Sequence, residues 1–234
     1  MGKVAEPGAP ASESRRERLV ELYKEASTCT LCPLAETRTK VVFGAGHADA
    51  DLMFIGEAPG AEEDRQGLPF VGRAGSILTG LLEEIGLRRE DVFVANTIKC
   101  RPPGNRDPQP IEVESCRPYL MEQIELIRPR VIGTLGNFAT RLITESRAPI
   151  SKVRGTPQLR TMSGVTVFVM PLFHPAAALR TPALLETLRE DFRALPDLLA
   201  QPVPEAAARE AATAAALAGA GTPEPDGDQL DLFG

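Results

Sequence analysis

Short apolar runs alternate with amphipathic stretches along most of the chain. A short apolar run between turn-forming residues is typical of a buried strand, whereas apolar residues three and four positions apart are typical of a helix. The predicted strands are 51–55, 92–95, 130–134 and 165–170. The predicted helices are 75–85, 110–127, 136–144 and 182–199, with an earlier one that contains Leu19, Val20, Leu22 and Tyr23 and ends near Thr28. This alternation predicts an α/β domain in which helices cover both faces of a parallel sheet.

The two ends of the chain differ in composition from the middle. Residues 1–14 lack apolar periodicity and are expected to be a disordered lead-in. Residues 201–228 are rich in Ala, Pro, Gly and acids and are expected to be a disordered linker. The last segment, 229–234, adds large apolar residues after this linker. The predicted folded domain is therefore 15–200, because 234 residues with 43% hydrophobic side chains leave little room for a second core.

Much of the net charge of −6 lies near the C-terminus. Residues 205–234 hold six acidic residues and one arginine, a total of −5, so the remainder carries about −1. A near-neutral body can still present a basic face, and the charge argues neither for nor against nucleic acid. No apolar run approaches the roughly 18 residues of a membrane span, and residues 1–18 contain no apolar stretch of the kind that a secretion signal needs. We expect a cytoplasmic, monomeric protein without a membrane partner.

Glycine-rich and polar loops follow three of the predicted strands. The carboxyl ends of parallel strands lie at one edge of a sheet, where ligand sites form. The loops 56–60, 96–105 and 173–179 are therefore expected to build one pocket. Asn96 suits a base edge but also an ordinary turn, and a lone strand-end histidine such as His174 is more often structural than catalytic.

Charged residues in these loops also have two readings. Glu62, Glu63 and Asp64 fit a solvated face or a helix N-terminus as well as a site. The cations Lys99, Arg101 and Arg106 suit phosphates, or simply an exposed loop.

Four cysteines form a set without a fifth: Cys29, Cys32, Cys100 and Cys116. In a reducing cytoplasm such a set indicates metal ligands rather than disulfides. The spacing suits either a tetrahedral zinc site or an iron–sulfur site. Spacing alone slightly favours zinc.

Several motifs occur in a fixed order: C-x-x-C, GEAPG, ED, PFVGRAG, N-x-x-K-C-RPP-x-N, a fourth Cys and FHP. In this order they resemble the family-4 uracil-DNA glycosylases, the iron–sulfur group, over about residues 27–199. The resemblance implies a three-layer α/β/α sandwich around a four-stranded parallel sheet. It also implies an enzyme that flips uracil out of DNA and hydrolyses its N-glycosidic bond, which starts base excision repair.

The resemblance implies roles for the pocket residues. Phe70 would stack on the uracil ring, Asn96 would pair with its O4 and N3–H, and His174 would face its O2, where negative charge accumulates. Gly56, Glu57 and Ala58 would form the pocket wall, the last two near uracil C5, with Asn105 close to the site. The residue that activates the water stays open among Glu57, Glu63 and Asp64. Base catalysis can be a small part of the mechanism, because stabilisation of the leaving group can supply most of the rate.

The resemblance further implies that the four cysteines hold a [4Fe–4S] cluster, which staples the loop 101–115 beside the pocket. Arg101 and Arg180 would contact DNA, and Leu179 is the candidate wedge into the duplex. An absence of histidine from 101–115 predicts ordinary turnover rather than covalent trapping of the product.

The C-terminal QLDLF resembles the pentapeptide by which bacterial repair proteins dock on the β sliding clamp. The residues involved would be Gln229, Leu230, Leu232 and Phe233, with the linker acting as a tether. Two other functions stay open: a non-catalytic iron–sulfur DNA-binding module, and a glycosylase of the same fold for hypoxanthine or xanthine.

Overall fold

A computed structural model describes residues 12–202, and its strands form one mixed sheet in the order β1-β3-β2-β4-β6-β5. The central strands β3, β2, β4 and β6 are mutually parallel, whereas β1 and β5 pair antiparallel at the two edges. The predicted four-stranded parallel sheet is confirmed as the centre, but the sheet is wider than predicted. The bounds are β1 (Ala45–Gly46), β2 (Leu52–Gly56), β3 (Phe93–Asn96), β4 (Val131–Leu135), β5 (Gln158–Met162) and β6 (Val165–Leu172).

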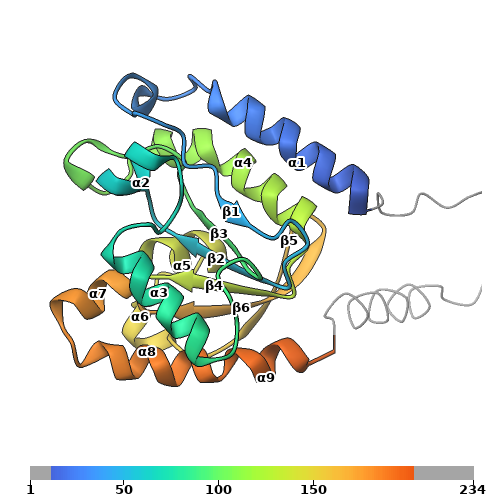
Figure 1. Cartoon of the computed structure of the whole chain (residues 1–234), viewed down its shortest axis with the longest axis vertical. Helices are drawn as coiled ribbons and strands as arrows, with labels where there is room; N and C mark the ends of the chain where they lie inside the picture. Colours follow the sequence, from blue (N-terminus) through green and yellow to red (C-terminus); the bar gives the residue numbers. More distant parts are fainter. Residues whose placement is uncertain (1–11, 203–234) are drawn as a thin grey trace, which may run out of the picture.

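Helices cover both faces of this sheet, as the alternating pattern predicts. Figure 1 shows the sheet between a layer that contains α1 and α4 and a layer that contains α3, α8 and α9. The bounds of the helices are α1 (Ser12–Ser27), η1 (Pro33–Glu36), α2 (Ala61–Gln66), α3 (Arg73–Glu84), η2 (Pro103–Asn105), α4 (Pro110–Ile127), α5 (Asn137–Thr144), α6 (Ile150–Val153), α7 (Pro175–Arg180), α8 (Leu184–Arg193) and α9 (Leu195–Ala200).

Each central strand sends its side chains into both layers. On β2, Met53 and Ile55 pack into the core beneath α1 and α4, and Leu52 and Phe54 into the core beneath α3 and α8. A side chain at Gly133 of β4 would approach the Phe54 ring to 2.7 Å, so glycine leaves the room that this ring occupies. Burial on two faces explains why these strands are continuously apolar in the sequence.

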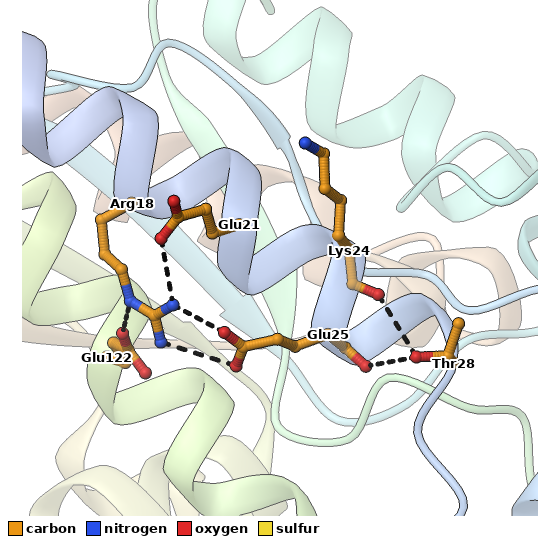
Figure 2. Close-up of polar contacts among 6 residues, drawn as sticks. All are labelled: Arg18, Glu21, Lys24, Glu25, Thr28 and Glu122. Carbon is orange, nitrogen blue, oxygen red and sulfur yellow. Dashed lines mark hydrogen bonds and ion pairs between the residues drawn. The ribbon is translucent and has the colours of Figure 1, made fainter.

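Helix α1 is fastened to α4 by an arginine that bridges them. Arg18 Nε donates to Glu122 Oε1 of α4 at 2.6 Å, and Arg18 Nη1 donates to Glu25 Oε1 of its own helix at 2.6 Å (Figure 2). Leu19 and Leu22 pack into the same core as Leu120 of α4. This packing sets the end of α1, and with it the first two cysteines, beside the helix that carries Cys116.

Helix α1 begins at Ser12, inside the predicted lead-in 1–14, and α9 ends at Ala200, where the predicted domain ends. The predicted helix 182–199 is divided at Ala194 into α8 and α9. Within residues 12–202, no helix is both long and apolar enough to cross a membrane. Most of the predicted linker and the predicted docking residues Gln229, Leu230, Leu232 and Phe233 lie outside the described residues.

Candidate active site

A cavity of about 670 Å³ opens at the carboxyl ends of the central strands. Its lining includes Glu57 after β2, Asn96 at the end of β3, Gly136 after β4 and His174 after β6. The volume lies within the range of about 300–1,000 Å³ that is usual for small-molecule sites. The three predicted loops therefore meet in one pocket, and the loop after β4 joins them.

Phe70 reaches this pocket through an unusual backbone conformation. Its φ is 53°, in the left-handed region, and a side chain on Gly75 would come within 1.8 Å of the Phe70 carbonyl oxygen. A side chain on Gly56 would lie 2.7 Å from Phe70 Cζ and 2.5 Å from Asn96 Oδ1. Gly56 does not line the cavity, but its missing side chain lets the ring and the amide approach each other.

The Phe70 ring stacks against the His174 imidazole, with 5.6 Å between the ring centroids and 27° between the planes. His174 Nδ1 accepts a hydrogen bond from the Ala176 backbone N–H at 3.1 Å. A neutral imidazole that accepts at Nδ1 carries its proton on Nε2, so Nε2–H is the donor. Burial, with the charge of Arg180, lowers the pKa of His174 to about 4, and the ring is neutral near pH 7.

Asn96 is almost fully buried, and its Oδ1 has no hydrogen-bond partner within residues 12–202. A buried acceptor without a partner is costly, and in a pocket it indicates a place where a ligand donates. The Asn96 backbone oxygen accepts from Lys99 Nζ at 2.9 Å, and Nζ also donates to Gln123 Oε1 at 2.6 Å. Lys99 is therefore buried inside the protein, and the expectation that it faces phosphates is wrong.

The candidate carboxylates differ in what they contact. Glu63 lies in α2 and lines the cavity, but its Oε1 accepts from the backbone N–H groups of Val71 and Gly72 at 3.1 and 3.0 Å. Asp64 is buried outside the cavity, and its Oδ1 accepts from Thr39 N–H. Glu57 lines the cavity and has no hydrogen bond to its carboxylate within the described residues.

Burial is the larger cause that raises the pKa of Glu57, and the negative charge of Asp107 is the second. Both effects disfavour the ionised form and make the Glu57 carboxylate a stronger base once it is ionised. Of the carboxylates that the sequence analysis put forward, only Glu57 both lines the cavity and has no hydrogen bond to its carboxylate within the described residues.

Of the predicted DNA contacts, Arg101 donates through Nε to Asn105 Oδ1 at 2.7 Å. Asn105 has a positive φ of 55° and lines the cavity at its exposed edge. Leu179 is 41% exposed on α7, and Arg180 lines the cavity beside His174. Arg180 and Asn105 thus line the cavity, whereas Arg101 and Leu179 are neighbours of lining residues and do not line it themselves.

The cysteines come from three parts of the fold and form no disulfide. Cys100 and Cys116 are buried and pack with Cys32, while Cys29 lies two residues after the end of α1. The Lys99 backbone N–H donates to Cys116 Sγ at 3.3 Å, and Arg38 Nη1 donates to Cys100 Sγ at 3.5 Å. As placed, no three His, Cys, Asp or Glu side chains within residues 12–202 form a group that could hold a metal ion. The donor set itself, thiols with N–H groups directed at the sulfurs, fits an iron–sulfur cluster.

Residues 43–198 match the protein family described as "Uracil DNA glycosylase superfamily". The chain belongs to the uracil DNA glycosylase superfamily. The matched region includes the whole parallel sheet and the loops that line the cavity. The fold and the family therefore agree with the resemblance seen in the sequence motifs.

Among curated relatives of this superfamily member, the chain is 45% identical to a type-4 uracil-DNA glycosylase of Archaeoglobus fulgidus, over 80% of this chain and 96% of the relative. It is 44% identical to a type-4 enzyme of Sulfurisphaera tokodaii, over 80% and 87% of the two chains. A type-4 enzyme of Thermotoga maritima is 48% identical over 70% and 85%. The similarity thus spans most of each protein.

The superfamily pocket also contains residues that the sequence analysis missed. Asp107 lines the cavity from the loop before α4, beside Arg106, and Gly136 and Asn137 line it after β4. Arg106 is held by two hydrogen bonds to Glu112, at 2.9 and 2.6 Å. The Gly-Asn pair after a predicted strand was a usable signal, because every parallel strand ends at the same edge of the sheet.

Proposed function

We propose that this protein is a uracil-DNA glycosylase that hydrolyses the N-glycosidic bond of a flipped-out deoxyuridine. Membership of the superfamily and the similarity to type-4 enzymes over most of the chain support this function. One observation carries the assignment to this pocket: a stacking ring, a buried unpaired amide oxygen and a neutral imidazole line the same cavity.

Base recognition would rest on Phe70 and Asn96. Phe70 offers a ring face on which a pyrimidine can stack. The free Oδ1 of Asn96 would accept from uracil N3–H, while its Nδ2 donates to O4. Cytosine presents an amino group and an unprotonated N3 at these positions, so it would leave the buried amide unsatisfied and be rejected. Glu57 and Ala58 line the cavity beside them, and we assign them to the wall at uracil C5.

His174 would stabilise the departing base. As the N-glycosidic bond breaks, negative charge accumulates on the uracil ring and its O2, and a donor fixed at that oxygen lowers the barrier. The neutral imidazole supplies such a donor at Nε2 because Nδ1 is occupied by Ala176 N–H. Water then adds to C1′ of the sugar, and Glu57 is the carboxylate available to take its proton, since Glu63 and Asp64 are engaged by backbone N–H groups.

The four cysteines would hold a [4Fe–4S] cluster. The donor set and the similarity to the type-4 enzymes support this assignment over zinc. When bound, the cluster would supply structural stabilisation at the base of the loop 101–115 rather than chemistry at the sugar. Iron and acid-labile sulfide analysis of anaerobically purified protein tests it, and zinc without sulfide would overturn it.

Binding of DNA and of the sliding clamp extends the proposal. Arg101 and Arg180 would contact phosphates, and Leu179 would enter the duplex. Arg180 lines the cavity, Leu179 is exposed one position before it, and Arg101 is hydrogen-bonded to Asn105 of the cavity lining. The tail residues Gln229, Leu230, Leu232 and Phe233 would dock on the β clamp, a proposal that rests on their sequence. Deletion of 229–234 should abolish clamp binding and leave release of uracil from short oligonucleotides unchanged.

The decisive experiment is a gel assay with oligonucleotides that contain uracil, hypoxanthine or xanthine. We expect cleavage after alkali treatment at uracil, and a loss of roughly 100-fold or more in Asn96→Ala and His174→Ala. His47→Ala is the matched control, because His47 is the other histidine and lies outside the cavity. Cleavage at hypoxanthine or xanthine alone would assign another deaminated base, and no cleavage at any base would leave a DNA-binding module.

A further inference from the structure

Two carboxylates face the cavity without a cation paired to either. Glu57 enters from the loop after β2, and Asp107 from the loop between η2 and α4. Within the described residues, neither carboxylate has a hydrogen bond or an ion pair to a donor. The neighbouring Arg106 does not neutralise Asp107, because its guanidinium is bound to the Glu112 carboxylate and to the Asp107 backbone oxygen.

The other ionisable groups that line the cavity are accounted for. They are Glu63, Arg106, His174 and Arg180. Glu63 is held by the backbone of the Phe70 loop, His174 is neutral near pH 7, and Arg180 acts on His174. After burial, the charge that acts on Glu57 is that of Asp107, which raises the pKa of Glu57 further.

We propose that Asp107 is a positioning residue that acts through Glu57: its unpaired negative charge in the same cavity disposes the Glu57 carboxylate to take a proton from the hydrolytic water. This inference rests on the proposed glycosylase function. The electron pair of the breaking C1′–N1 bond leaves with uracil N1, and the water oxygen forms the new bond to C1′. One water proton goes to Glu57, and the uracil anion is later protonated from solvent.

A simpler role for Asp107 predicts a different outcome. Asp107 lies shortly before Gln109, the N-cap of α4, where a negative charge stabilises a helix through its dipole. In that case its removal would lower stability and scale the rate equally at every pH. A shift of the pH profile therefore separates the two roles.

The test is single-turnover uracil release by the full chain at saturating enzyme, followed from about pH 4 to pH 9. Ionised Glu57 is the active base, so the rate is lost as pH falls through the pKa of Glu57. We expect Glu57→Gln to lower the plateau rate by roughly 100-fold and to remove this acid limb. Asp107→Asn should lower the pKa of Glu57, so the acid limb of this variant should move to lower pH. Its plateau rate should fall roughly 2–10-fold, because a weaker base takes the proton from water less readily.

The controls isolate charge from structure. Asp107→Glu keeps the charge and should keep the limb at the wild-type position. Glu114→Gln removes an exposed carboxylate of α4 that does not line the cavity, and should change neither limb nor plateau. Asp107→Asn combined with Glu57→Gln should be no slower than Glu57→Gln, because Asp107 acts through Glu57. Asp107→Ser repeats the test if the amide variant unfolds.

The results separate this inference from the proposed function. If the wild-type protein releases no uracil, the function fails. If it releases uracil but the acid limb of Asp107→Asn stays in place, or if the two substitutions multiply, only the role of Asp107 is refuted.

Discussion

Gly56→Ala is the substitution that tests the geometry of the pocket most directly. The added methyl group would lie 2.5 Å from Asn96 Oδ1 and 2.7 Å from Phe70 Cζ, and ordinary contact begins at 3.4 Å. The amide and the ring would therefore have to move by 0.9 and 0.7 Å. Gly56 does not have a positive φ, so alanine fits its backbone and the effect comes from these two contacts.

A displacement near 1 Å in a reacting geometry can cost about 100-fold in rate. We therefore expect Gly56→Ala to lower single-turnover uracil release by roughly that factor. Overpacking should also lower stability by about 1–3 kcal/mol, which a denaturant titration measures. The matched control is Gly80→Ala in α3, where an added Cβ meets nothing within 4 Å and alanine favours the helix. Wild-type rate in a folded Gly56→Ala protein would refute the reasoning.

Three further results are expected. Titration of His174 should not change the rate of uracil release between about pH 5 and pH 8, because its pKa is lowered to about 4 and the neutral ring is the active form. A loss of rate as the pH rises past the ordinary pKa of histidine, absent from His174→Asn, would contradict this. Glu63→Ala should raise KM by releasing the loop that carries Phe70, at a stability cost of about 0.5–1.5 kcal/mol per lost hydrogen bond, whereas Glu63→Gln keeps an acceptor and most of the affinity. Cys100→Ser should lose most bound iron and melt at a lower temperature than the wild type by circular dichroism, and unchanged iron content would exclude Cys100 as a ligand.

The apolar pattern predicts the parallel centre of the sheet because strands that are buried on both faces consist mostly of apolar residues. The edge strands lack that constraint. β1 has only the two residues Ala45 and Gly46, too few to show a period, and β5, Gln158–Met162, alternates between half-buried and exposed positions with a mostly polar sequence. The short helix α2, Ala61–Gln66, has no apolar side chain larger than alanine and therefore gives no amphipathic signal.

The pocket was predictable as far as strand ends determine it. Phe70, Asn96 and His174 converge because the loops that carry them meet at one edge, although Phe70 also needs the left-handed turn that only the structure shows. Lys99 shows the limit of reading charge from a loop. Its ammonium points inward to the Asn96 carbonyl and Gln123, and no local pattern distinguishes a buried lysine from one that faces phosphate.

Asp107 was missed for a related reason: its importance depends on a neighbour distant in sequence. In the sequence it is one of several acidic residues near the start of a helix. Stabilisation of the helix dipole is enough to explain an acid there, so nothing in the sequence indicates a second role. Only the fold brings it to the same cavity as Glu57, fifty positions earlier in the chain. Because electrostatic coupling depends on distance in space, the charges that act on Glu57 have to be sought among the cavity lining rather than among its neighbours in the sequence. The loop 101–115, which carries Asp107, lies between Cys100 and Cys116, so a group held by the cysteines would fix both of its ends.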